Sequence, residues 1–97
     1  MSVKDMYLRE YKESSWTAFV ALFQEEYGRV KPQLKEKARQ QGIPEDIGTV
    51  LLSEMGEYLF KWLGASVPAL DHAKPADLLR DEDGIKALKA AILRMSR

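Results

Sequence analysis

The side chains that could perform acid–base, nucleophilic or metal chemistry are few in this chain. It contains one histidine, His72, which follows Asp71 in a stretch flanked by prolines, and it contains no cysteine. A single imidazole without thiolates excludes Cys–His nucleophile pairs and multi-histidine or thiolate metal sites. A lone histidine between prolines is more typical of a turn than of a catalytic triad. We therefore expect no enzyme activity, no cofactor and no metal site.

Three consecutive acidic residues, Asp81, Glu82 and Asp83, are the other group that suggests a cation site. They lack the alternating aspartate spacing of a calcium-binding loop. Acidic residues at this place are explained by a helix that begins there, because a side-chain oxygen caps the first turn and the helix dipole favours negative charge. The run predicts a helix start.

The basic segment from Arg29 to Arg39 is the feature most typical of nucleic-acid binding. It contains five cations and one acid, Glu36, and it leads into the outline of a helix, a glycine-containing turn at Gly42 and a second helix. The candidate recognition helix, however, begins with Glu45 and Asp46, which would repel phosphates. We expect a solvated helix face here and keep a DNA-binding regulator as the alternative. The candidate contacts are Arg29, Lys31, Lys35, Lys37 and Arg39.

The composition predicts a soluble, single-domain protein. Of 97 residues, 45% are hydrophobic, and 15 basic residues balance 15 acidic ones. There is thus no overall field to attract nucleic acid or anionic membrane. The first ten residues contain no apolar signal-like run, and no apolar stretch approaches the length of a membrane span. These features predict a cytoplasmic location.

The apolar spacing predicts an all-α, compact single domain of four main helices. Residues 1–13 form either a docked helix or a frayed arm. A helix capped by Ser14 or Ser15 then runs to Gly28, with an inward stripe at every third or fourth position: Trp16, Phe19, Val20, Phe23 and Tyr27.

The second predicted helix begins at Pro32 and ends before Gly42, where Ile43 packs back on Ala38. The third spans residues 45–63. Its two interior glycines, Gly48 and Gly56, predict either a close backbone approach or a helix that is kinked or broken near one of them.

The inward stripe of the third predicted helix is Ile47, Leu51, Met55, Tyr58 and Trp62. The last helix follows a cap at Asp81, and its inward stripe is Ile85, Leu88, Ile92 and Met95. Between these two helices, the 64–81 connector contains Pro68 and Pro75 and has irregular apolar spacing. It predicts an ordered segment with one short helical turn that starts at Pro75.

Residues 62–97 resemble the C-terminal toxin-binding domain of MbcA/ParS/Xre-type antitoxins. That family has, in order, Trp-Leu, an Asn-Pro-Ala-Leu-Gly-Gly turn, a proline before a Leu-Leu turn, an acidic stretch, a glycine and an apolar helix. The matching residues here are Trp62, Leu63, Pro68, Ala69, Leu70, Pro75, Leu78, Leu79, Gly84, Leu88, Ile92 and Leu93.

The resemblance implies that the chain binds and neutralises a RES-domain, NAD-consuming toxin, and that it self-associates as a homodimer. A helical dimerisation or scaffold module without a toxin is a further alternative. The matching residues are expected to be mainly structural. Partner contact is expected instead from the basic end of the last helix, at Lys86, Lys89, Arg94, Met95 and Arg97.

The chain departs from the family pattern at three places in the connector. Asp71 and His72 stand where the family has Gly-Gly, and Val67 replaces its asparagine. Lys74, directly before Pro75, stands where the family has a small hydroxyl-bearing or similar residue. Asp and His tolerate a positive φ better than most residues. Residues 1–61 do not clearly match the helix-turn-helix that many members carry.

Overall fold

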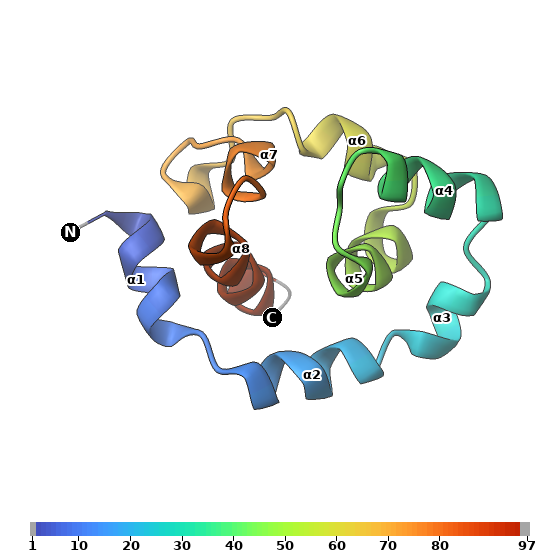
Figure 1. The fold of residues 1–97 in the computed structure, drawn as a ribbon, viewed down its shortest axis with the longest axis horizontal. Helices are drawn as coiled ribbons and strands as arrows, with labels where there is room; N and C mark the ends of the chain where they lie inside the picture. The colour runs from blue at the N-terminus through green and yellow to red at the C-terminus, as the bar shows by residue number, and fades with distance from the viewer. Residues whose placement is uncertain (1, 96–97) are drawn as a thin grey trace.

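This computed structural model describes residues 2–95 and is built around two central helices, α5 (Glu45–Met55) and α8 (Glu82–Met95). Figure 1 views both nearly end-on, with α1, α2, α3 and α4 following one another around them. Residues 2–95 form eight α-helices and one 3₁₀ turn: α1 (Val3–Glu10), α2 (Glu13–Ala21), α3 (Gln24–Gly28), α4 (Pro32–Gln40), α5 (Glu45–Met55), α6 (Tyr58–Trp62), η1 (Pro68–Leu70), α7 (Pro75–Leu78) and α8 (Glu82–Met95).

The fold is therefore all-α, as predicted, although the chain is divided into more helices than the four main ones expected. The described residues contain no strand, and Val67 and Ala73 form an isolated antiparallel bridge. Within residues 2–95, no helix combines the length and the apolar character needed to cross a membrane.

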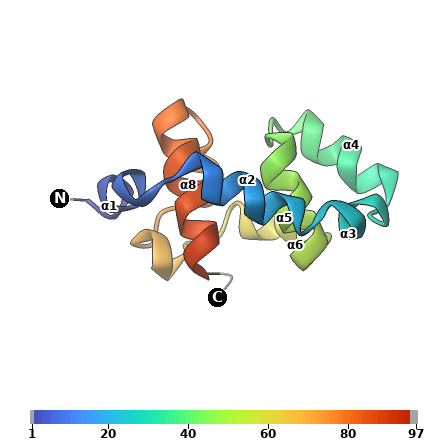
Figure 2. The ribbon, with the colours of Figure 1, turned by 90° about the horizontal axis from the view of Figure 1, so that it is seen from below.

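The buried apolar side chains form one cluster around α5 and α8. From α5, Ile47, Val50 and Leu51 are almost completely buried, and α8 contributes Leu88 and Ile92. Helix α2 packs on both central helices, and Figure 2 shows it running across them. Helix α1 packs on α8 and thus forms a docked helix, the first of the two predicted alternatives.

The predicted 15–28 helix is divided between α2 and α3. The amides of Leu22 and Phe23 donate to carbonyls three residues back instead of four, which tightens the chain into a bend. Neither residue is a helix breaker. The bend allows Trp16, Phe19 and Phe23 to keep facing the core as a row of contacting aromatic rings. The predicted serine cap was wrong, because α2 begins at Glu13 without a side-chain cap.

The predicted 45–63 helix is broken at Gly56, which has φ +56° and separates α5 from α6. The break turns Tyr58 away from the core, and its side chain is 54% exposed, so its predicted inward position was wrong. Trp62 is half-buried. The predicted break near one of the two glycines is thus at Gly56. At Gly48, α5 continues, and no neighbouring atom lies within 4 Å of an added Cβ.

Four other helix boundaries agree with the predicted signals. Pro32 opens α4, Gly42 has φ +77°, and the Ile43 amide donates to the Ala38 carbonyl at 3.0 Å. At the start of α8, the Asp81 carboxylate accepts a hydrogen bond from the Gly84 amide at 2.6 Å. Pro75 opens α7, as predicted.

Candidate functional site

The connector between α6 and α8 is closed on itself by backbone hydrogen bonds. The Val67 amide donates to the Ala73 carbonyl at 3.2 Å, and the His72 amide donates to the Val67 carbonyl at 2.9 Å. Asp71 and His72 both lie in the left-handed region, with φ of +56° and +63°. These are the two positions at which the antitoxin family has glycine. The turn thus has a backbone that glycine adopts more easily than the residues present.

This closed turn is held against the remainder of the fold from two directions. The Tyr7 hydroxyl of α1 donates to the Ala69 carbonyl at 3.0 Å, and Leu70 points into the core with 4% exposure. The Ala76 amide donates to the Leu63 carbonyl at 3.0 Å, which ties α7 to the end of α6. The connector is a shaped element and not a loose linker.

Gly84 is required by close backbone packing between α7 and α8. A Cβ added there would lie 2.1 Å from the Leu78 carbonyl oxygen and 2.9 Å from its carbon. No side chain fits at that separation. Among the residues on which the predicted resemblance rests, Leu63, Leu70, Pro75, Gly84 and Leu88 are buried, whereas Leu78, Leu79 and Trp62 are partly buried and Pro68 is exposed. Most of these side chains therefore pack within the fold and are not exposed to a partner.

The structure does not bring the predicted partner contacts on α8 together. Lys89 points inward to Asp46 of α5, with Nζ 2.9 Å from Oδ2 and a side chain only 16% exposed. Arg94 points to α1, where it pairs with Glu10 at 3.3 Å. Met95, 39% exposed, lines a small hollow beside Trp62, and Lys86 is exposed. Arg97 lies outside the described residues. Lys86 and Met95 are the described members left accessible without an intramolecular ion pair.

The Asp46–Lys89 pair belongs to a polar cluster that sequence reasoning missed. The Trp16 indole N–H of α2 donates to Asp46 Oδ2 of α5 at 2.8 Å, and the Ile47 amide donates to Asp46 Oδ1. A buried tryptophan needs an acceptor for its N–H, which was the available signal. The sequence did not indicate that the acceptor lies 30 positions away.

The cluster sets the ionisation of Asp46. Partial burial acts to raise the pKa of this carboxyl, but the hydrogen bonds from Lys89 and Trp16 outweigh it and hold the pKa below its ordinary value. Asp46 therefore joins α2, α5 and α8 as a carboxylate. Tyr11 lies near the same lysine, and burial raises the pKa of its hydroxyl.

The five basic residues of the predicted nucleic-acid segment lie on different surfaces. Arg29 pairs with Glu25 and Glu26 on α3. Lys37 lies over the Phe60 ring of α6, whereas Lys35 lies over the Tyr27 ring of α3, at 4.3 Å from Nζ to the ring centre.

Arg39 pairs with Glu36, and Lys31 is exposed just before α4. The candidate recognition helix α5 is buried from Ile47 to Leu52. It has no free face for a DNA groove, and its most exposed described positions include Glu45 and Glu54.

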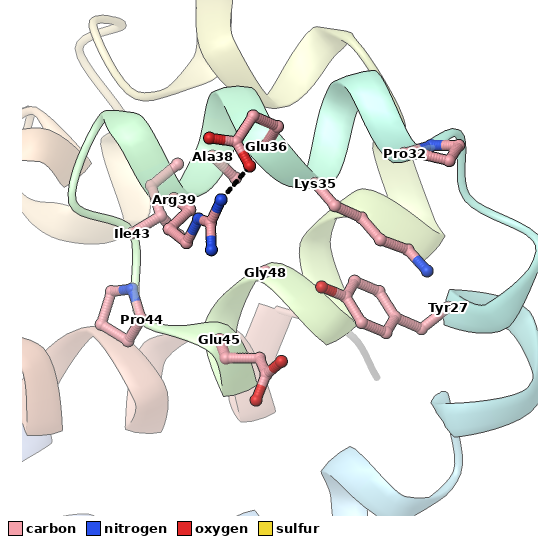
Figure 3. Close-up of a pocket in the computed structure, with 10 residues that line it drawn as sticks. All are labelled: Tyr27, Pro32, Lys35, Glu36, Ala38, Arg39, Ile43, Pro44, Glu45 and Gly48. Atoms are coloured by element: carbon pink, nitrogen blue, oxygen red, sulfur yellow. Dashed lines mark hydrogen bonds and ion pairs between the residues drawn. The ribbon is translucent and has the colours of Figure 1, made fainter.

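A groove of about 420 Å³ lies between α3, α4 and the beginning of α5. Figure 3 shows the Tyr27 ring and Lys35 on one side, with Gly48 on the α5 side. Burial, together with the Glu45 carboxylate, raises the pKa of the Tyr27 hydroxyl above its ordinary value. The lining residues are Tyr27, Pro32, Lys35, Glu36, Ala38, Arg39, Ile43, Pro44, Glu45 and Gly48.

Metal-ligating side chains do not cluster in this part of the chain. Across residues 2–95, no three His, Cys, Asp or Glu side chains are placed so that they would hold an ion. Asp81 is occupied as a helix cap, with an additional ion pair to Lys4 at 3.7 Å.

Comparisons with known proteins give no match to any family model, curated protein or solved structure.

Proposed function

We propose that the chain is a protein-binding module of the MbcA/ParS/Xre antitoxin type, which binds and neutralises a RES-domain toxin. The observation that carries the proposal is the backbone at Asp71 and His72, because both have positive φ where the family has Gly-Gly. Two consecutive left-handed residues are uncommon without glycine. A turn that retains this conformation with other side chains supports a shared local fold.

Gly84 adds independent support. The family has a glycine between its acidic stretch and its last helix, and here the Leu78 carbonyl lies where any Cβ would be. The resemblance thus includes positions where backbone geometry, and not only apolar character, selects the residue type. In this proposal the chain acts by binding and not by catalysis, and Lys86 and Met95 are the contacts of α8 that a toxin would meet.

Co-expression with the product of the neighbouring gene tests the proposal. We expect the tagged chain to co-purify with that protein and to prevent its depletion of cellular NAD. Lys86→Glu should weaken capture of the neighbouring protein. Lys12 is an exposed lysine ahead of α2, and Lys12→Glu is the matched control. Failure to capture an NAD-consuming neighbour, or capture that leaves NAD depletion unchanged, would refute the proposal.

The DNA-binding alternative receives less support from the geometry, because α5 is buried and the five cations are dispersed. A gel shift with the chain's own upstream DNA at two salt concentrations tests it, since phosphate contacts make affinity fall steeply with salt. For the dimerisation alternative, the exposed Tyr58 and Met95 are apolar surface available to a second copy. Light scattering of the purified chain would measure that association.

A further inference from the structure

Two exposed ion pairs hold the ends of α1 on the α8 side of the fold. Near the beginning of α1, Lys4 Nζ lies 3.7 Å from Asp81 Oδ1, and at its end Glu10 Oε2 lies 3.3 Å from the Arg94 guanidinium. The four side chains are between 40% and 63% exposed. Ion pairs in such surroundings are screened by salt and are individually weak. Both ends of α1 are therefore held loosely.

The middle of α1 contributes the one side chain of this helix that is buried, Tyr7. Its hydroxyl donates to the Ala69 carbonyl of the connector at 3.0 Å. The other apolar side chains of α1 are only partly buried. Elements with so little buried apolar surface open at a lower free energy than the whole fold. Eight residues are also too few for a stable isolated helix, so α1 unfolds when it leaves α8.

The seam between α1 and α8 is not closely filled. A hollow of about 210 Å³ is lined there by Glu10 of α1 and by Ala90, Leu93 and Arg94 of α8. Figure 1 shows α1 at one end of the molecule, beside α8 and away from α3 and α4. The backbone of residues 11–12, which joins α1 to α2, is extended. Helix α1 can thus leave the seam without breaking a continuous helix.

We propose that α1 is a detachable strap, which opens as one unit while the remainder of the fold stays intact. Opening breaks the hydrogen bond of Tyr7 and both ion pairs. It uncovers the α8 side of the seam, where Ala90 and Leu93 lie beside the cation of Arg94. The strap therefore controls access to this side of α8. It is a property of the isolated chain and does not depend on the antitoxin proposal.

Hydrogen exchange of the ¹⁵N-labelled full chain, followed by NMR at increasing urea, measures the opening. The amides from Met6 to Glu10 report on α1, and the interior amides of α5 and α8 report on global unfolding. We expect the α1 amides to share one protection factor, at least about tenfold lower than that of the central amides, with little dependence on urea. Salt at about 0.5 M should lower the protection of α1 alone.

Two variants identify the contacts that hold the strap. Tyr7→Phe keeps the ring and removes the hydrogen bond to Ala69, so the protection of α1 should fall by about two- to tenfold. Glu10→Gln should lower it by up to about fivefold. The matched controls are Tyr27→Phe on α3 and Glu36→Gln, which removes the exposed pair with an arginine on α4. Both controls should leave the protection of α1 unchanged.

A thiol probe measures access to the seam. The chain has no cysteine, so Ala90→Cys carries its only thiol, and a polyethylene-glycol maleimide is too large for the hollow. Labelling of Ala90→Cys should become faster when Tyr7→Phe is added, by the same factor as the exchange of the α1 amides. Ala38→Cys is the matched control, because both alanines are 5% exposed and each lines a hollow. Its labelling should not respond to Tyr7→Phe.

The proposal is overturned if the α1 amides have the protection and the urea dependence of α5 and α8, because α1 would then be inseparable from the fold. It is equally overturned if protection declines residue by residue toward Ser2, which is the fraying of a chain end, or if Tyr7→Phe lowers protection throughout the chain. Labelling of Ala90→Cys that does not respond to Tyr7→Phe would also overturn it, because α1 would then not control access to the seam.

Discussion

Gly84→Ala and Gly48→Ala should change stability in opposite directions, although both add one methyl group to a helix glycine. At Gly84, the new Cβ would lie 2.1 Å from the Leu78 carbonyl oxygen, so this distance must increase by at least about 1.3 Å to reach the 3.4 Å of an ordinary contact. Overpacking of this kind costs about 1–3 kcal/mol or more. The better helix propensity of alanine returns only about 1 kcal/mol.

At Gly48, the methyl group meets no atom within 4 Å, and the propensity gain stands alone. We expect Gly48→Ala to be more stable by up to about 1 kcal/mol. The atoms that obstruct a Cβ at Gly84 are backbone and cannot rotate away, so the cost lies at the upper end of the overpacking range. After the propensity gain is subtracted, Gly84→Ala should be less stable by about 2 kcal/mol, which lowers the melting temperature by roughly 8–16 °C in a domain of this size.

Urea unfolding followed by circular dichroism measures both variants against the parent chain. The slope of each transition must stay constant for the midpoints to report stability. A Gly84→Ala variant as stable as the parent would refute the close α7–α8 packing. A destabilised Gly48→Ala would show that a methyl group does not fit in the space beside Gly48.

Three further predictions concern the connector, the central ion pair and Trp62. Asp71→Gly and His72→Gly should each stabilise the chain by about 0.5–1 kcal/mol, measured by urea unfolding, because glycine adopts a positive φ without steric cost; unchanged midpoints would contradict the left-handed turn. The pKa of Asp46 is lowered in the folded chain, so the contribution of Asp46 to folding stability is present above its unfolded pKa and is lost as pH falls through the lower folded value. In acid unfolding, Asp46→Asn should therefore show a weaker dependence of stability on pH than the parent chain does. An acid-unfolding curve equal to that of the parent would contradict this role of Asp46. Trp62→Ala should cost about 2 kcal/mol, less than the 3–5 kcal/mol of a fully buried tryptophan, because the ring is half-buried; a loss below about 1 kcal/mol would place the ring on the surface.

Helix boundaries that depend on local chemistry were predictable from the sequence. Pro32 and Gly42 bound α4, and Asp81 caps α8, because in each case the signal and its effect lie within a few residues. The division at Leu22 and Phe23 was not predictable. It has no local breaker and arises because the chain bends around the two central helices.

The candidate site was less predictable than the helices, because it depends on which side of a helix meets which neighbour. Lys89 and Arg94 belong to one basic helix end in sequence, yet the packing directs them to α5 and α1. The groove combines Tyr27, Lys35 and Gly48 from three helices, and no local spacing indicates that they meet.

The docking of α1 on α8 has a consequence for how the chain folds during synthesis. The hydrogen bond from Tyr7 to Ala69 spans 62 positions, and the contact of Arg94 with Glu10 spans 84. Helix α1 leaves the ribosome early, but the surface that it covers does not exist until α8 has been made. The conformational entropy lost in closing such long loops is not offset until the contacts between the loop ends form, and this slows folding. We therefore expect α1 to dock late, with the apolar side of Tyr7 exposed until the last helix has formed.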